Sequence, residues 1–436
     1  MEERHRRLLI RQNPWWRGEK PSLPEFERDL LGELLRYVDY PQILAVVGMR
    51  RVGKTTLMKQ LIQKLKAPEK NICYISFDDI DFQKYEVADE LISYFLEFSD
   101  GSTRRYLFLD EVQKLPHWAD LLKTYYDSED NLKMFVSGSA SLEIKEYKET
   151  LAGRILTFHL PVLTFREFLR YRGMRWQISR ENLFREYDLK FAMHREKYQR
   201  YFEDYLEKGA FPELLDVEDR EFIRRYIKEA VVEKAIADVA RITGDDERII
   251  YELFRLLAKS NAQLFEIVNL ARILGINRNK VSKYLSLLEK AFLIRIGYNY
   301  SPSVAKQLRK RKKQYISHSC IVMALLDYPR EILNTEVAGQ LVEACIAGHF
   351  EKVNFWRSPQ KDEVDLVVDG DGLLAVEVKY RSHISRREIG GLLKFVKRYG
   401  ARGVVVTRER LERGQFRGVD VLFIPAWLFL LLDSPA

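Results

Sequence analysis

The chain has 436 residues, which exceeds what one hydrophobic core usually serves, so we expect two to four domains. Lysine and arginine outnumber aspartate and glutamate by 72 to 64, and the resulting net charge of +8 favours a polyanionic partner without requiring one. Three distant cysteines and seven scattered histidines argue against a disulfide framework and a zinc site. No membrane segment is expected, because the last apolar run, IPAWLFLLL, is too short, and we expect a cytoplasmic protein.

After an N-terminal arm over residues 1–22, short apolar runs alternate with amphipathic helical patterns as far as residue 161. The candidate strands are ILAVV, NICYISF, RYLFLD, KMFVSG and ILTFHL. Strands that alternate with helices in this way predict a parallel sheet with helices on its faces. We therefore expect an α/β domain over residues 23–163.

The first candidate strand is followed by the stretch GMRRVGKT and then by a helical pattern. Glycines let backbone N–H groups turn toward a β-phosphate, while Lys54 can reach the β- and γ-oxygens and Thr55 can offer its hydroxyl to Mg²⁺. The stretch predicts a phosphate-binding loop for ATP. Its nucleotide-binding residues would be Gly48, Met49, Arg50, Arg51, Val52, Gly53, Lys54, Thr55 and Thr56.

The strand RYLFLD ends in Asp110 and is followed by Glu111, at the sheet edge where open α/β sheets bind ligands. We expect Asp110 to hold Mg²⁺ through water and Glu111 to act as the general base. Ser137 could sense the γ-phosphate, with Ser139 as a rival and an ordinary polar strand end as an equal alternative. Arg154 could stabilise charge in its own chain or across a subunit boundary, which would need a homo-oligomer; a surface arginine is the simpler alternative.

Residues 164–243 have a helical periodicity that predicts a lid over the ATPase domain, and residues 244–314 predict a winged helix with a basic linker. Within the latter, Gly275 to Asn277 would supply the turn between two helices. The second helix would contact DNA from its N-terminal end. The predicted DNA-binding residues are Arg278, Asn279, Lys280, Ser282 and Lys283. A solvated basic face on a subunit-packing module is the alternative.

Residues 315–436 are expected to form another α/β domain, in which Glu363 to Tyr380 is a hairpin. Apolar alternation places Asp365 opposite Glu377, and the three-residue loop Gly370 to Gly372 agrees with that register. Two opposed carboxylates repel unless a cation bridges them, so we expect a divalent metal there, with Lys379 beside it. The copies of the same pattern at Glu143–Lys145 and Glu146–Lys148 lie in a predicted helix, where residues two apart do not face each other.

The chain resembles prokaryotic, mainly archaeal, ASCE/AAA-type P-loop ATPases that carry a winged helix and a restriction-endonuclease-like C-terminal domain. The matching pieces are QNPWW, GMRRVGKTT, YLFLDEVQ, VSGSAS, LAGRILTFHLPVLTFREFL, GAFPEL, and EVD with EVK. The hairpin resembles the PD-(D/E)xK nucleases, which implies catalytic roles for Asp365, Glu377 and Lys379, with Glu343 as an assisting helix carboxylate and Mg²⁺ or Mn²⁺ as the metal.

These expectations combine into an ATP-hydrolysing, DNA-processing protein with a metal-dependent nuclease-like domain. The main alternative is a nucleotide-dependent regulator that binds DNA and uses the nuclease-like fold as a non-cleaving scaffold. A signalling or chaperone-like ATPase that never touches nucleic acid is the third class, and it would show no salt-sensitive DNA binding.

Overall fold

The computed structural model describes residues 2–138, 149–174, 183–184, 194–303, 307, 311–370 and 372–432. The chain divides into two compact units, Met1–Pro161 and Val162–Ala436. Each unit contains one sheet of its own. The first unit therefore ends close to residue 163, where the sequence placed the end of the ATPase domain.

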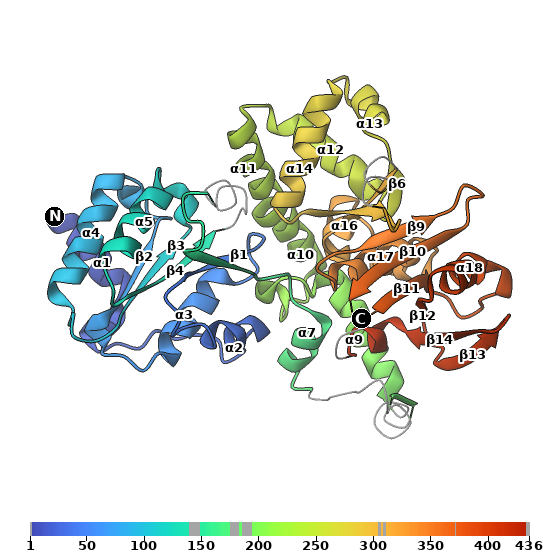
Figure 1. Cartoon of the computed structure of the whole chain (residues 1–436), viewed down its shortest axis with the longest axis horizontal. Coiled ribbons are helices and arrows are strands. Elements are labelled where there is room, and N and C mark those ends of the chain that lie inside the picture. The colour runs from blue at the N-terminus through green and yellow to red at the C-terminus, as the bar shows by residue number, and fades with distance from the viewer. Residues whose placement is uncertain are drawn as a thin grey trace. The chain divides into compact units, whose positions relative to one another are not determined.

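The first unit consists of a parallel sheet and the helices that cover it (Figure 1). Its helices are α1 (Glu3–Gln12), α2 (Asp29–Leu35), α3 (Lys54–Lys64), α4 (Tyr85–Phe98) and α5 (Trp118–Ser128), with short 3-10 turns η1 (Pro14–Arg17), η2 (Glu69–Asn71), η3 (Ile80–Phe82) and η4 (Val112–Lys114). Its strands are β1 (Ile43–Val47), β2 (Ile72–Ser76), β3 (Arg105–Asp110), β4 (Leu132–Gly138) and β5 (Ile155–His159).

The five strands lie in the order β2-β3-β4-β1-β5, and every neighbouring pair is parallel. This confirms the predicted parallel sheet. All residues of β1, β3 and β4 are buried, as expected for strands covered on both faces, which explains why they were visible as continuous apolar runs. Because all strands run the same way, the loops after β1, β3 and β4 meet at one edge.

Side chains of the N-terminal arm cover the free edge of β2. The contacts are Gln12 Oε1 with Ser76 N at 2.8 Å, Asn13 Oδ1 with Tyr74 N at 2.6 Å, Asn13 Nδ2 with Tyr74 O at 2.8 Å, and the indole nitrogens of Trp15 and Trp16 with Ile72 O at 2.9 and 2.8 Å. An uncovered edge strand is a template for pairing with another chain. The QNPWW stretch thus supplies by side chains the partners that a sixth strand would supply by backbone.

The second unit joins a helical part to a mixed sheet. Its helices are α7 (Phe165–Tyr171), α9 (Arg195–Lys208), α10 (Arg220–Tyr226), α11 (Lys234–Thr243), α12 (Glu247–Lys259), α13 (Ile267–Leu274), α14 (Arg278–Lys290), α16 (Ser319–Leu325), α17 (Val337–Gly348), α18 (Gly390–Tyr399) and α19 (Ala426–Phe429), with shorter turns η6 (Pro212–Leu214), η7 (Ile227–Glu233), η8 (Arg330–Asn334) and η9 (Arg386–Ile389). Its strands are β6 (Gln263–Phe265), β7 (Ile294–Asn299), β8 (Lys312–Ile316), β9 (Asn354–Arg357), β10 (Glu363–Gly370), β11 (Gly372–Lys379), β12 (Arg402–Thr407), β13 (Glu412–Phe416) and β14 (Val419–Pro425).

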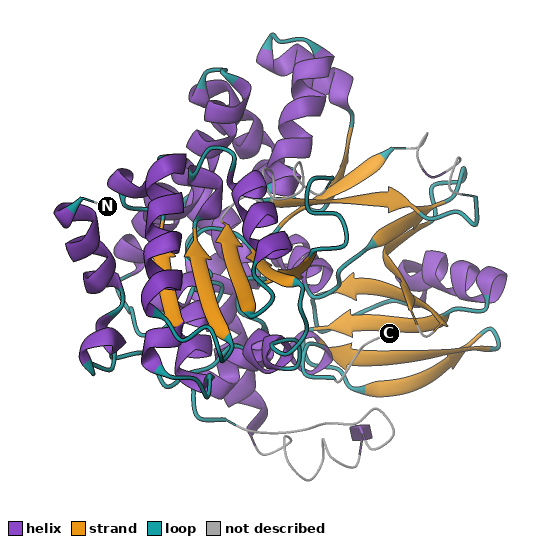
Figure 2. Cartoon of the chain, turned by 60° about the vertical axis from the view of Figure 1, so that its left-hand side comes forward, coloured by secondary structure: helices purple, strands orange, loops and turns teal. Residues whose placement is uncertain are grey.

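One nine-stranded sheet runs through this unit in the order β13-β14-β12-β11-β10-β9-β7-β8-β6, and Figure 2 shows its strands as one twisted succession. Strand β7 pairs in parallel with β9, which joins the predicted winged-helix segment to the predicted nuclease-like segment. Strand β8 spans the expected boundary after residue 314. The two segments therefore share a sheet in this structure.

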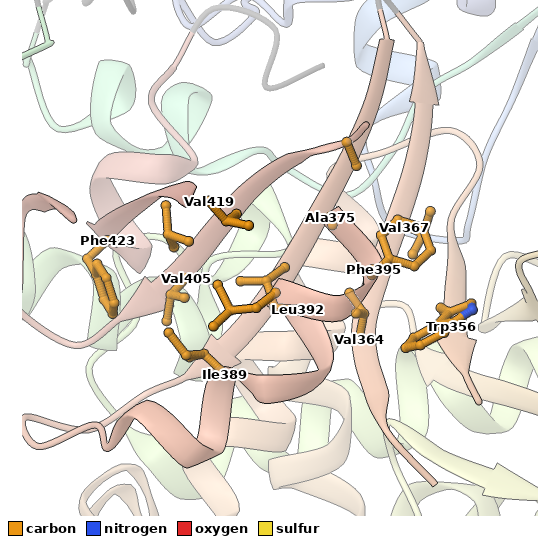
Figure 3. Close-up of a cluster of buried hydrophobic side chains, with 13 residues drawn as sticks. Trp356, Val364, Val367, Ala375, Ile389, Leu392, Phe395, Val405, Val419 and Phe423 are labelled. Carbon is orange, nitrogen blue, oxygen red and sulfur yellow. The ribbon is translucent and has the colours of Figure 1, made fainter. Parts of the chain in front are cut away.

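The apolar core beside the hairpin lies between the sheet and α18 (Figure 3). It contains Trp356, Val364, Val367, Ala375, Ile389, Leu392, Leu393, Phe395, Ala401, Val405, Val419, Val421 and Phe423. Helix α18 has glycine at position 391, where a Cβ would lie 2.1 Å from the carbonyl oxygen of Glu363. That close approach fixes α18 against the start of β10. The core thus holds in place the strand that carries Asp365.

Candidate functional site

The phosphate-binding loop connects β1 to α3, as the sequence predicted. Gly53 and Arg51 have left-handed backbones, with φ of 96° and 67°, which bends the loop around its centre. A Cβ at Gly48 would lie 2.3 Å from the carbonyl oxygen of Leu160, so only glycine fits there. Lys54 is buried, and its ammonium donates to the loop carbonyls of Gly48 and Met49 at 3.1 and 3.0 Å. The lysine is therefore held at the concave side of the loop.

Asp110, at the end of β3, lies beside this loop. Its Oδ2 accepts hydrogen bonds from Thr55 Oγ1 and from the Tyr74 hydroxyl, both at 2.7 Å, and its Oδ1 accepts one from Ser137. The loop threonine and the strand aspartate, which we expected to share a magnesium ion, are thus in contact. These are hard oxygen donors of the kind that Mg²⁺ prefers.

Glu111 is also placed at this edge, with a left-handed backbone of φ 53°. Its backbone N–H donates to Ser137 Oγ at 3.2 Å, and its side chain accepts from Gln113 Nε2 at 2.6 Å. The Lys54 ammonium lies 4.0 Å from Glu111 Oε1. Ser137 therefore contacts both acids, whereas its rival Ser139 lies outside the described residues.

Arg154 does not join this group. It precedes β5 and its carbonyl bonds Ile43 N, so it lies at the amino edge of the sheet, one strand length from the phosphate-binding loop. Its guanidinium makes a bidentate pair with Asp127 at 2.8 and 3.0 Å. The structure therefore does not bring Arg154 to the phosphate-binding loop of its own chain, and the pair with Asp127 fits the simpler alternative of a surface arginine.

Two residues of this site had escaped the sequence analysis. Tyr74 lies within a strand pattern, and only the pairing of β2 with β3 brings its hydroxyl to Asp110. Burial, and then the charge of Asp110, raise the Tyr74 pKa well above its ordinary value, so the hydroxyl remains a donor. Arg28 is buried and donates to Val52 O at 2.6 Å and Pro161 O at 2.8 Å, which braces the loop from outside.

In the second unit, α13 and α14 form the predicted pair of helices. Gly275 has φ 65°, and the side chain of Asn277 caps α14 by accepting from Asn279 N at 2.8 Å. All the predicted DNA-binding residues, Arg278, Asn279, Lys280, Ser282 and Lys283, are exposed. Lys280 pairs with Asp245 at 2.6 Å, which occupies one of these charges. The basic run from Lys306 to Gln314 is described only at residue 307 and from residue 311 onward.

The hairpin has the register that the sequence predicted. Leu366 pairs with Val376, and Gly370 pairs with Gly372, whose φ is 98°; Asp371 between them is outside the described residues. The paired residues end at Leu366 and Val376, and the same register continued by one residue would bring Asp365 opposite Glu377. Asp365 Oδ2 accepts from Val378 N at 2.8 Å and lies 4.0 Å from the Lys379 ammonium.

Lys379 is directed at the acids, with its ammonium 2.6 Å from Glu377 Oε1. Burial, and then the charge of Asp365, raise the pKa of Glu377 to about 8. Glu377 Oε2 is buried and has no hydrogen-bond partner among the described residues. The hairpin therefore brings Asp365, Glu377 and Lys379 together, as expected from their spacing.

Glu343, on α17, lies in an apolar stretch where an unpaired carboxylate is costly, and the structure gives Lys313 as its polar partner, which the sequence alone did not identify. The Lys313 ammonium on β8 lies 2.5 Å from Glu343 Oε1, 3.4 Å from Glu363 Oε1 and 3.6 Å from Asp365 Oδ1. Burial opposes the charge of Lys313, but the charges of Glu343 and Asp365 outweigh it and raise its pKa. The acid cluster is thus bridged by a lysine of the basic run that we had expected to be a linker or wing.

The metal expected at the hairpin stays a prediction. In the described part of the chain, no group of three or more histidine, cysteine, aspartate or glutamate side chains is arranged to hold a metal ion. The copies of the ExK pattern at Glu143–Lys145 and Glu146–Lys148 are outside that part. Across the same residues, no helix combines the length and apolarity that a membrane span requires.

Comparison with known proteins finds similarity for the region that contains the first site. Residues 40–169 match a family model described as AAA domain. This segment of the chain, which contains the predicted phosphate-binding loop, is therefore similar to AAA domains. Residues 199–331 and 330–427 match two models, each described as a domain of unknown function, DUF8612 and DUF4143.

Several curated relatives align with most of the chain at low sequence identity. An uncharacterized protein of Methanocaldococcus jannaschii is 26% identical over 437 residues, covering 93% of this chain and 89% of its own. One from Haemophilus influenzae is 24% identical over 418 residues, covering 91% and 97%. A solved Walker-type ATPase of Pyrococcus abyssi is 16% identical with a TM-score of 0.42, covering 69% of this chain and 96% of its own.

Proposed function

We propose that this protein binds and hydrolyses ATP in its first unit and binds DNA through its second. The observation that carries the first part is the contact between Thr55 Oγ1 and Asp110 Oδ2 at 2.7 Å, beside a lysine held in the loop. A Mg²⁺ ion bound there would neutralise charge on the transferred phosphoryl group.

The chain's own groups supply the remaining steps. Lys54 would exchange its loop carbonyls for phosphate oxygens, which are stronger acceptors for an ammonium. Glu111 would orient and deprotonate the attacking water, and Gln113 and Ser137 hold it at that edge. The buried position of Asp110, which is 1% exposed, excludes bulk water from the contact with Thr55.

The test of ATP binding compares Lys54→Ala with Lys64→Ala. Both lysines belong to α3, but Lys64 is half-exposed and pairs with Glu27 at 2.6 Å, away from the loop. We expect Lys54→Ala to lose ATP binding in calorimetric titration and Lys64→Ala to bind like wild type. Equal affinities for the two variants would contradict the proposed site.

DNA binding is supported by the exposed polar face of α14 and by the winged-helix order of elements. Strands β7 and β8 form an antiparallel pair, and β6 adds to β8, after three helices α12, α13 and α14. Arg278 and Lys283 are both exposed and would contact phosphates. In a helix-turn-helix, the residues at the N-terminal end of the second helix contact the base edges.

Each phosphate contact adds about one to the slope of log affinity against log salt. We therefore expect Lys283→Ala to weaken duplex binding and lower this slope by about one, measured by fluorescence anisotropy at several salt concentrations. Lys234→Ala, an exposed lysine at the start of α11, is the matched control and should leave both unchanged. A wild-type protein without salt-sensitive DNA binding would contradict this part of the proposal.

A metal-dependent nuclease is the second candidate, favoured by the convergence of Asp365, Glu377 and Lys379. The partnerless Glu377 Oε2 fits a cation ligand, and Mg²⁺ is commonly held by one or two carboxylates with substrate phosphates. Such a metal, Mg²⁺ or Mn²⁺, would activate water for phosphodiester hydrolysis, and Lys379 would orient a phosphoryl oxygen. The alternative is a scaffold that does not cleave.

Labelled single- and double-stranded DNA, incubated with Mg²⁺ or Mn²⁺, distinguishes these two. A nuclease predicts cleavage by wild type and by Lys394→Ala, an exposed lysine of α18 paired with Asp362 at 2.6 Å, but loss of cleavage in Lys379→Ala. If all three proteins behave identically on every substrate, the hairpin is a scaffold that does not cleave DNA.

A further inference from the structure

Lys313 lies where a divalent cation would otherwise bridge the acids of the C-terminal cluster. Its ammonium is within 4 Å of three carboxylates, those of Glu343, Glu363 and Asp365, and its side chain is 3% exposed. Three carboxylates from a helix and a strand thus converge on one positive charge supplied by a third element, β8. In the metal-dependent arrangement expected from the sequence, that charge would come from the ion.

The backbone of Lys313 is held from both sides. In the sheet it pairs with Gly297 of β7 and with Leu264 of β6. Its ammonium also lies 5.9 Å from the centre of the Tyr315 ring, and the Tyr315 hydroxyl donates to Asp365 O at 3.2 Å. The lysine and the strand that carries Asp365 are therefore connected by more than the ion pairs.

Its neighbours in the basic run behave differently. Lys312 places its ammonium over the Tyr298 ring at 5.1 Å, and Arg311 pairs with Glu266 at 2.7 Å, with its side chain 63% exposed. Strand alternation turns Lys313 inward while Lys312 points elsewhere. The buried position is thus specific to one residue and does not belong to the run as a whole.

A divalent ion and this ammonium cannot share the Glu343 side. Mg²⁺ takes carboxylate oxygens at about 2.0 to 2.1 Å, so an ion on Glu343 Oε1 would lie within roughly 5 Å of the Lys313 ammonium, two like charges in a buried site. Neither Glu343 Oε1 nor Glu377 Oε2 has a hydrogen-bond partner among the described residues. Glu343 Oε1 has the Lys313 ammonium at 2.5 Å, whereas the ion pair of Glu377 with Lys379 is made by its other oxygen, Oε1.

We infer that Lys313 is a built-in counter-charge that takes the place of a divalent cation on the Glu343 side of the cluster. At most one metal position remains, between Asp365 and Glu377, and Glu343 is not a metal ligand. This inference goes beyond the proposed function, and it gives Glu343, which was expected to be an assisting helix carboxylate, an ion pair with Lys313. It holds whether or not the protein cleaves DNA.

The test uses the full-length protein without nucleotide, and its variant is Lys313→Met, which keeps the length of the side chain and removes the charge. In EDTA this variant should unfold roughly 10 °C below wild type, because buried carboxylates lose their partner. Added Mn²⁺ should restore most of the difference and bind to the variant with at least tenfold higher affinity than to wild type, followed by electron paramagnetic resonance. Lys312→Met is the matched control and should resemble wild type throughout.

A Lys313→Met protein that binds Mn²⁺ like wild type and is not restabilised by it would overturn the inference. If the Lys313→Met variant does not fold, Glu343→Gln in an otherwise unchanged chain tests the inference instead. Because Glu343 is not a ligand in this account, Glu343→Gln should bind Mn²⁺ as wild type does. A loss of Mn²⁺ binding in Glu343→Gln would equally overturn it.

Discussion

The coverage of edge strand β2 by the N-terminal arm gives a prediction whose size follows from the structure. Asn13 is fully buried and makes three side-chain hydrogen bonds: Nδ2 to Leu9 O and to Tyr74 O, both at 2.8 Å, and Oδ1 from Tyr74 N at 2.6 Å. At a net contribution of about 1 kcal/mol per bond, Asn13→Ala should lower the free energy of unfolding of the first unit by about 3 kcal/mol. The loss falls on backbone groups of Tyr74 that then lack partners.

Urea unfolding of the full chain measures the total effect, and hydrogen exchange of peptides covering β2 locates it. Exchange of the Tyr74 amide should accelerate about 100-fold in Asn13→Ala, as 3 kcal/mol implies. Arg17→Ala removes an exposed pair with Glu19 at 3.0 Å in the same arm and should change stability by less than about 0.5 kcal/mol. An Asn13→Ala protein as stable as Arg17→Ala, with unchanged exchange, would refute the edge-covering role.

Two further predictions concern other buried positions. Gly48→Ala should reduce ATP affinity at least tenfold in calorimetric titration, because its Cβ would meet the Leu160 carbonyl. The control Gly32→Ala has open space around it in α2 and should raise the free energy of unfolding by about 0.5 to 1 kcal/mol. ATP binding by Gly48→Ala at wild-type affinity would contradict this prediction. Burial lowers the pKa of His318 from 6.5 to about 3. As pH falls, the unfolded chain therefore takes up this proton before the folded chain does, so the free energy of unfolding decreases between pH 6.5 and 3. The decrease should be about 2 kcal/mol at pH 5. His318→Asn keeps an acceptor for Cys320 N and should remove this loss, which unfolding midpoints at pH 7.5 and 5 would show; equal shifts in both proteins would contradict it.

The first sheet could be predicted because each strand is buried on both faces and its residues are therefore apolar throughout, as ILAVV of β1 shows. Strand β13, Glu412–Phe416, could not be predicted. It is an edge strand with the sequence ERGQF and is largely exposed, so no apolar alternation marks it. Only its pairing with β14 makes it a strand.

The candidate sites divide in a similar way. The register of Asp365 against Glu377 followed from local alternation and loop length, which the hairpin contains within itself. Tyr74 and Lys313 could not be found, because each reaches its acids only after strands distant in sequence come to lie in one sheet. The sequence left Arg154 with several alternatives. A residue before a parallel strand lies at the edge opposite the loop that follows the neighbouring strand, which favours the surface alternative.

The central claim is that the first unit hydrolyses ATP with Thr55, Asp110 and Glu111. The substitution Glu111→Gln tests this claim most directly. Its measurement is phosphate release with Mg²⁺ and ATP, alongside ATP binding by the same protein. We predict that Glu111→Gln binds ATP like wild type but releases phosphate at one hundredth of the wild-type rate or lower. A general base contributes about 10²- to 10⁴-fold to the rate, which sets this expectation. Phosphate release at the wild-type rate by Glu111→Gln would contradict the account.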